Sequence, residues 1–91
     1  MRTLALETDP LAVDVTFSAD VFRVALEDGR ELSIPLAWFP RLLRASPEQR
    51  QNWELIGRGE GVHWDELDED ISVAGLLAGR GDQTRARTRA A

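Results

Sequence analysis

The sequence predicts one small α+β domain: an antiparallel sheet of four to five strands with two or three short helices. Three observations support this fold class: apolar residues alternate with polar ones in the first third, a serine-proline helix start lies in the middle, and a glycine closes an apolar stretch near residue 79. A chain of 91 residues supports one small core. We expect a lead-in segment at 1–11, the single domain at 12–79 and a disordered arginine-rich tail at 80–91.

Three strands are expected between residues 13 and 36, because apolar residues there recur with the two-residue period of a strand that has one face in water. Asp28 and Gly29 separate the second and third runs and predict a type I′ hairpin, in which both residues take positive φ. Pro35 has no N–H to donate, so the third strand is expected at an edge. The residues predicted to face the core are Val13, Val15 and Phe17, then Phe22, Val24 and Leu26, then Leu32, Ile34 and Leu36.

Two short helices are expected next. Residues 37–45 have apolar residues at helical spacing, with Pro40 tolerable only in a first turn. Ser46, Pro47 and Gln49 form the pattern of a capping box, which predicts that a second helix starts there.

The last part of the domain is predicted to hold a hairpin and a helix. WELIG (53–57) and GVHW (61–64) are expected as the fourth and fifth strands, joined by a turn through residues 58–60. The acidic run that follows is expected to be a loop. A helix then has Ser72 or Asp70 as its N-cap and Gly79 as its end.

Charge is unevenly distributed along the chain. The formal net charge is −5, and all the basic residues are arginine. The tail from residue 80 carries +3, which leaves −8 on the rest. Because the summed field of a protein steers charged partners, an acidic body disfavours nucleic acid and favours a basic protein.

Several classes of protein are disfavoured by composition. The chain has no cysteine, so it has no disulfide, no thiolate nucleophile and no cysteine-based zinc site. Its apolar runs are far shorter than the roughly 20 residues that span a bilayer, and acidic residues appear early in the N-terminal segment. We therefore expect a bacterial, cytoplasmic protein without membrane association or cofactor.

Four segments resemble a small bacterial family, domain of unknown function 2442: DGR (28–30), WFPRL (38–42), SPEQR (46–50) and GEGVHWDELDEDISVAGLLAG (59–79). The resemblance covers about residues 12–79. It implies a compact α+β domain and no established activity. Some relatives carry a helix-turn-helix domain after this unit, and some look like one half of a two-gene, toxin-antitoxin-like module, which implies protein interaction. Since only twelve residues follow Gly79 here, we expect no DNA binding through a second domain.

The only histidine, His63, precedes a run of carboxylates and is the first candidate for a metal or catalytic residue. His63 and Asp65 would point to the same side of a strand. A zinc site would need several further ligands, all of them carboxylates here, and the acidic run does not match the EF-hand spacing. No spacing places a serine nucleophile beside His63. The glycine-rich stretch at 57–61 lacks the lysine of a phosphate-binding loop and predicts a hairpin turn.

The favoured hypothesis is a non-enzymatic interaction module with a basic protein partner, of the kind found as the antitoxin-like or regulatory half of a two-gene module. The alternative is a metal-dependent or hydrolytic enzyme that uses His63 and Asp65. Weak nucleic-acid binding through the tail arginines is a third idea. The sequence leaves open whether Trp38, Trp53 and Trp64 belong to the core or the surface. The predicted partner-binding residues are His63, Trp64, Asp65, Glu66, Asp68, Glu69, Asp70 and Trp38.

Overall fold

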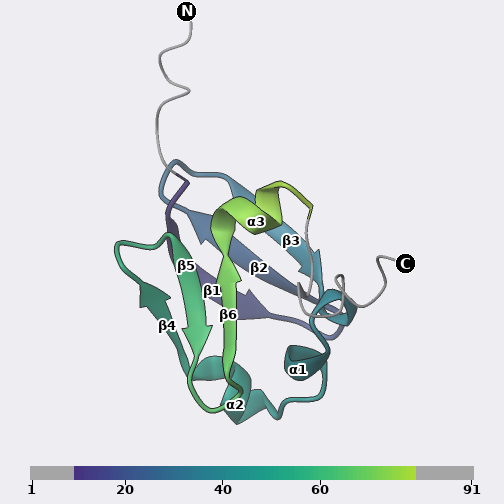
Figure 1. Ribbon diagram of the computed structural model, residues 1–91. Coiled ribbons are helices and arrows are strands. Elements are labelled where there is room, and N and C mark those ends of the chain that lie inside the picture. The colour runs from purple at the N-terminus through teal and green to yellow at the C-terminus, as the bar shows by residue number, and fades with distance from the viewer. Residues whose placement is uncertain (1–9, 80–91) are drawn as a thin grey trace, which may run out of the picture.

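The computed structural model describes residues 10–79, which form two three-stranded antiparallel sheets and short helices. Figure 1 shows the second sheet lying in front of the first, with α3 at one end of the layers and α1 and α2 at the other. The first sheet, in the order β1-β2-β3, contains β1 (Ala12–Phe17), β2 (Val21–Leu26) and β3 (Glu31–Pro35). The second, in the order β4-β5-β6, contains β4 (Trp53–Ile56), β5 (Gly61–Trp64) and β6 (Glu69–Ser72). The helices are η2 (Leu36–Trp38), α1 (Pro40–Leu43), α2 (Pro47–Gln51) and α3 (Val73–Leu77).

The predicted α+β class with antiparallel strands is confirmed, but the prediction of one sheet of four to five strands is wrong. The additional strand is β6, within a segment expected to be a loop. Its side chains do alternate between buried and exposed, but Glu69 occupies a buried position beside Ile71. A carboxylate at a core position hides the strand period from a search for apolar residues. The predictions for residues 1–9 and for the tail lie outside the described residues.

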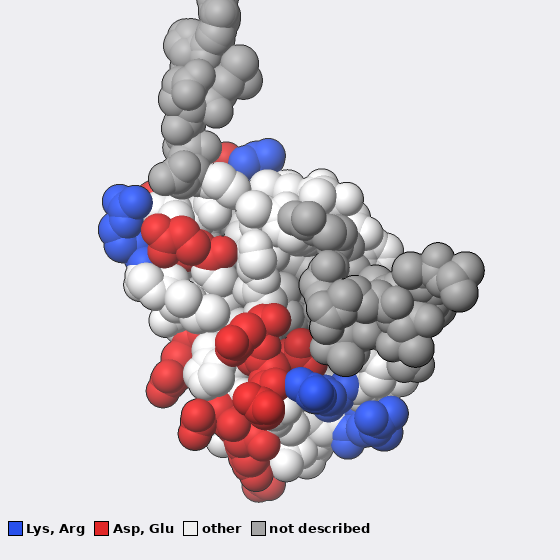
Figure 2. All heavy atoms as spheres, viewed as in Figure 1, with Lys and Arg blue, Asp and Glu red and all other residues white. Residues whose placement is uncertain are grey.

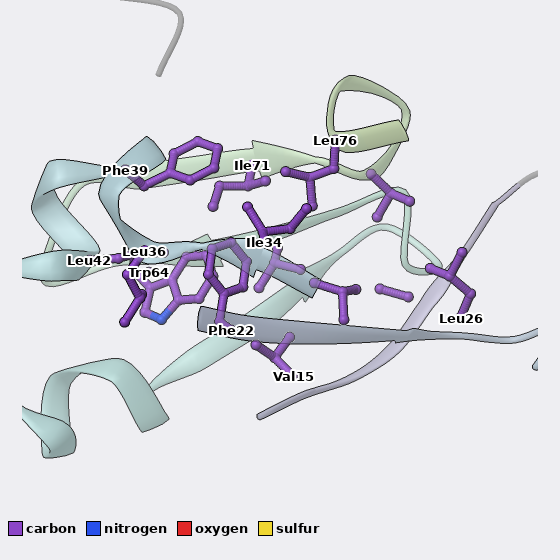
Figure 3. Packing of buried hydrophobic residues seen from close by; sticks show 14 residues of the cluster. Val15, Phe22, Leu26, Ile34, Leu36, Phe39, Leu42, Trp64, Ile71 and Leu76 are labelled. Atoms are coloured by element: carbon purple, nitrogen blue, oxygen red, sulfur yellow. The ribbon is translucent and has the colours of Figure 1, made fainter. Parts of the chain in front are cut away.

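Both sheets contribute to one core between them. Trp64 of β5 packs edge to face against Phe17 of β1, with ring centroids 6.4 Å apart. Phe22 of β2 makes a similar contact with Phe39, at 5.9 Å, and so joins the first sheet to the segment before α1. Figure 3 shows Trp64, Phe22 and Phe39 among the buried side chains that lie between the strands. The fully buried large side chains are Trp64, Phe22, Leu36, Leu42, Val24, Val62 and Val73.

The first strand departs from its predicted alternation at Val13, which is 51% exposed. The register shifts between Ala12, which pairs with Leu26, and Asp14, which pairs with Ala25. This β-bulge turns Ala12 to the core and Val13 to solvent, whereas Val15 remains buried as predicted.

The start of β1 is also tied to the second sheet. The Ala12 N–H donates a hydrogen bond of 2.7 Å to the carbonyl of Gly59, in the turn between β4 and β5. Gly59 has a φ of +118°. A Cβ at Gly59 would lie 2.4 Å from the Ala12 carbonyl oxygen, so this close approach of two backbones requires glycine. The glycine-rich segment is thus a hairpin turn, as predicted.

The hairpin between β2 and β3 is present, but its turn is not type I′. Gly29 has a φ of +96°, and Asp28 is not among the described residues with positive φ. The Gly29 N–H donates to the Leu26 carbonyl and the Leu26 N–H to the Arg30 carbonyl, the pattern of a three-residue loop with a glycine bulge. Arg30 also pairs with Asp28 at 2.8 Å, and this hydrogen bond lowers the pKa of the Asp28 carboxyl.

Proline controls the segment after β3. Pro35 is exposed on the edge strand, as predicted. The helix expected at 37–45 is broken into η2 and α1, because Pro40 cannot donate an N–H and disfavours helical φ and ψ at Phe39, which has φ −131° and ψ 87°.

Two predicted helix boundaries are confirmed. The Gln49 N–H donates to Ser46 Oγ at 3.1 Å, and the Ser46 N–H donates to Gln49 Oε1 at 2.9 Å, which completes the capping box of α2. Ser72, and not Asp70, caps α3 by accepting from the Gly75 N–H at 3.0 Å.

Candidate interaction surface around His63

The alternation of β5 places His63 on the outer face of the second sheet. Val62 and Trp64 point into the core on either side of it. Across the sheet, His63 pairs with Glu54 of β4 and with Asp70 of β6. Residues paired in this way lie on the same face of an antiparallel sheet. One row of side chains therefore contains a histidine between two carboxylates.

Further carboxylates come from the turn at residues 65–68 that joins β5 to β6. Asp65, Glu66 and Asp68 are all exposed there. The Asp68 N–H donates to the Asp65 carbonyl at 3.2 Å. Asp68 has a φ of +53°, a conformation that aspartate tolerates better than most residues do. The local chemistry of this turn thus favours the acidic residues that it displays.

Two contacts from the helices fix the turn in place. The Arg41 side chain of α1 donates from Nη1 to the Asp68 carbonyl at 2.6 Å. The Gln49 side chain of α2 donates from Nε2 to Glu66 Oε2 at 3.1 Å. The backbone of the acidic turn and the Glu66 carboxylate are therefore held by tertiary hydrogen bonds.

The imidazole of His63 contacts a carboxylate through each of its nitrogens. Nδ1 meets Asp70 Oδ1, and Nε2 meets Asp65 Oδ1 at 3.3 Å. The hydrogen bond with Asp70, followed by the one with Asp65, raises the pKa of His63 above its ordinary value of 6.5. Hydrogen bonds from both ring nitrogens require the protonated ring, so the surroundings favour the imidazolium.

Figure 2 shows that Asp and Glu side chains gather on the face of the molecule that carries β5 and β6, with Lys or Arg side chains only at the border of that cluster in this view. A shallow groove borders the same face, lined by Gln51, Asn52, Trp53, Glu54, Asp65 and Glu66. We use the term acidic surface for Glu54, His63, Asp65, Glu66, Asp68 and Asp70.

Two predicted partner-binding residues belong to the core. Trp64 is 1% exposed, and its Nε1 donates to the Arg50 carbonyl at 3.0 Å. Glu69, its cross-strand neighbour, is 7% exposed. Both side chains lie on the inner face of their strands, so neither is exposed beside His63 and we leave both out of the acidic surface.

The other two tryptophans differ from Trp64. Trp53 is half-buried and packs against the core, opposite Trp64 in the β4–β5 pair. Trp38 is 38% exposed, but it lies on η2, which contacts β2 of the first sheet. Trp38 was included among the predicted partner-binding residues only because aromatic residues are common at interfaces.

Glu54 was missed as a member of the acidic surface. A regular hairpin around the predicted turn at residues 58–60 would pair His63 with Leu55, but the observed connection spans residues 57–60 and pairs His63 with Glu54. The supporting roles of Arg41 and Gln49 were missed as well, because their contacts join distant parts of the chain.

The geometry limits the acid-base chemistry available to His63. A general base needs a ring nitrogen that can accept a proton from substrate, but both nitrogens here face carboxylates. Ser46 and Ser72 cap helices through their hydroxyl groups.

Within residues 10–79, no three side chains of His, Cys, Asp and Glu are placed to hold a metal ion. No helix in that range has the length and apolar character to cross a membrane.

Comparisons with known proteins agree with this fold. The family model described as Protein of unknown function (DUF2442) matches residues 12–82. A crystal structure of a protein of unknown function from Rhodospirillum rubrum has 31% identity and a TM-score of 0.73, over 86% of this chain and 96% of that one. A solution NMR structure of an uncharacterised protein from Chromobacterium violaceum has 29% identity and a TM-score of 0.72, over 89% of this chain and 78% of that one.

No curated protein sequence matches the chain. The family model spans both sheets and every helix described above, including the acidic turn and β6. The chain therefore belongs to the DUF2442 family of proteins of unknown function.

Proposed function

We propose that the chain is a non-enzymatic interaction module that binds a basic protein through the acidic surface. The observation that carries the proposal is the fixed acidic turn: exposed carboxylates at Asp65, Glu66 and Asp68, with the turn held by Arg41 and Gln49. A surface fixed before binding loses less conformational entropy when a partner docks.

The arrangement of charges also supports a basic partner. Glu54, Asp65 and Asp70 surround His63, so a single imidazolium is set against three neighbouring carboxylates. The surface remains negative even when His63 is protonated. Complementary charge raises the rate of association and selects the sign of the partner. In this proposal the partner is a small basic protein encoded by a neighbouring gene, as in an antitoxin-like two-gene module.

A hydrolytic or metal-dependent reaction at His63 and Asp65 is the competing function. The contact between His63 and Asp65 supports this competing function. Against it stand the second carboxylate on Nδ1 and the open position of the surface, because general acid-base chemistry benefits from a free ring nitrogen and exclusion of water. Metal analysis of the purified protein and His63→Ala in an activity screen would separate the two functions.

The interaction is tested by capture from the host lysate on immobilised full-length protein at low salt. The wild type should retain a basic protein, and the variant Asp65→Asn/Glu66→Gln/Asp68→Asn should lose it. Asn at position 68 tolerates the positive φ, so the turn should survive the substitution. Added salt should weaken the capture, since exposed charges are screened.

The matched control removes the same number of negative charges from the first sheet and its connections. Asp14→Asn/Asp20→Asn/Glu31→Gln changes three exposed residues there. This variant should capture the partner as well as the wild type does. Equal capture by the turn variant, or recovery of no basic protein, would overturn the proposed function.

A further inference from the structure

His63 is the group in the acidic surface whose charge changes near neutral pH. The charged and titratable groups that face it come from three elements: Glu54 from β4, Asp70 from β6 and Asp65 from the turn. Its side chain is 30% exposed, so protons reach it from solvent. The state of this ring therefore affects both the charge of the surface and the contacts that hold its carboxylates.

The two carboxylates are not equivalent partners. Asp70 lies directly across from His63 in the β5–β6 pair, so the sheet register fixes its position. Asp65 is in the turn, its side chain is 94% exposed, and its contact with Nε2 spans 3.3 Å. If one contact is lost, the more exposed Asp65 side chain is the one that can move into solvent.

A neutral imidazole has a single N–H. With that hydrogen on Nδ1 toward Asp70, Nε2 carries a lone pair that faces the Asp65 carboxylate, and two acceptors repel each other. Deprotonation therefore converts the Asp65 contact from attraction to repulsion while the Asp70 contact remains. The proton leaves to solvent, and no other group needs to change its charge.

We infer that His63 is a proton-controlled latch on the acidic surface: the protonated ring holds the Asp65 carboxylate, and the neutral ring releases it to a basic partner. The inference rests on the proposed function for its consequence in binding. When His63 loses its proton, the surface gains one unit of negative charge and a free carboxylate. Exposed ion pairs of this kind change affinity by about two- to fivefold.

The raised pKa of His63 agrees with this geometry, because the contacts with Asp70 and Asp65 both favour the charged ring. Between about pH 5.5 and about pH 9, carboxylates with ordinary pKa values stay ionised and arginine stays charged. A change in binding across that range can therefore be assigned to the histidine if it disappears in a variant without an imidazole.

The latch itself is tested by NMR on the full-length protein without any partner. The side-chain carboxyl carbon of Asp65 should shift with the same midpoint as the His63 ring as pH rises. In His63→Gln, which keeps a polar side chain but does not titrate, the Asp65 signal should stay constant over the same range. An Asp65 signal in the wild type that is flat through the His63 midpoint would overturn the latch.

The consequence for binding is tested with a hexa-arginine peptide at constant low salt. The affinity of the wild type should rise about two- to fivefold from about pH 5.5 to about pH 9, and that of His63→Gln should not change. Glu31→Gln, a charge change on β3, should keep the wild-type pH dependence. An affinity that is flat in the wild type would contradict the inference. If no variant binds at any pH while the carboxyl signal of Asp65 still shifts at the His63 midpoint, the proposed function fails and the latch stands.

Discussion

Replacement of Trp64 by phenylalanine is expected to destabilise the fold strongly, because this side chain belongs to the core and not to the acidic surface. The substitution removes the hydrogen bond from Nε1 to the Arg50 carbonyl, which is worth about 1 kcal/mol. It also leaves about 40 Å³ of space, which costs about 1 kcal/mol at roughly 24 cal/mol per Å³. The loss of apolar contact area brings the total to about 2–3 kcal/mol.

Urea unfolding followed by circular dichroism measures this loss. For a domain of this size, a loss of that magnitude lowers Tm by about 10–20 °C. The matched control is Trp38→Phe, because Trp38 is 38% exposed, and it should change the free energy of unfolding by less than about 0.5 kcal/mol. Equal stability of Trp64→Phe and the wild type, or an equal loss in both variants, would refute the assignment of Trp64 to the core.

Two further predictions concern the turns and the histidine. Gly59→Ala should lower the free energy of unfolding by about 3 kcal/mol or more, since the φ of Gly59 is +118° and a Cβ there would lie 2.4 Å from the Ala12 carbonyl oxygen. Gly29 also has a positive φ, but the space around it is open. Gly29→Ala should therefore lower the free energy of unfolding by only about 1 kcal/mol in the same assay. His63 has a raised pKa in the folded state, so its stabilising contribution should be complete below pH 6.5 and should disappear as pH rises through the raised value. The free energy of unfolding of the wild type relative to His63→Gln should therefore fall across that range, and Asp70→Asn should reduce the fall; an increase with pH would show that the sign is wrong.

Helix caps and regular strands were predicted correctly, because their residue types have one physical role at those positions. Ser46 with Gln49 formed its capping box, and Ser72 capped α3. The alternation through Phe22, Val24 and Leu26 marked a strand because every inward residue is apolar. These features depend on neighbours within a few positions, which the sequence displays directly.

Features that depend on pairing between strands were harder to predict. The bulge at Ala12 turns Val13 to solvent. The sequence of β1 does not mark this bulge, because the bulge depends on the pairing with β2 and on the hydrogen bond to the Gly59 carbonyl. The third strand of the second sheet, β6, was missed because it places Glu69 at an inward position. Once β6 was taken for a loop, the alternation that buries Glu69 and exposes Asp70 could not be used.

The candidate surface was predicted in part. His63 and Asp65, which were expected to point to the same side of a strand, are in contact, although Asp65 lies in the turn after β5. The pairing of His63 with Asp70 depends on the β5–β6 hairpin, which the sequence did not predict. Trp64 was grouped with the acids because it adjoins them in sequence, but alternation along the strand sends it to the opposite face.

Whether the acidic surface binds a basic partner is tested most directly by NMR titration of the isotope-labelled full-length chain with the basic protein captured from the host, or with hexa-arginine as a probe. The account predicts saturable shifts of the backbone amides of the acidic surface, centred on the turn at 65–68, and their loss in Asp65→Asn/Glu66→Gln/Asp68→Asn. The same titration in Asp14→Asn/Asp20→Asn/Glu31→Gln should reproduce the wild-type shifts. Shifts confined to the first sheet, or unchanged by neutralisation of the turn, would contradict the assignment of binding to this surface.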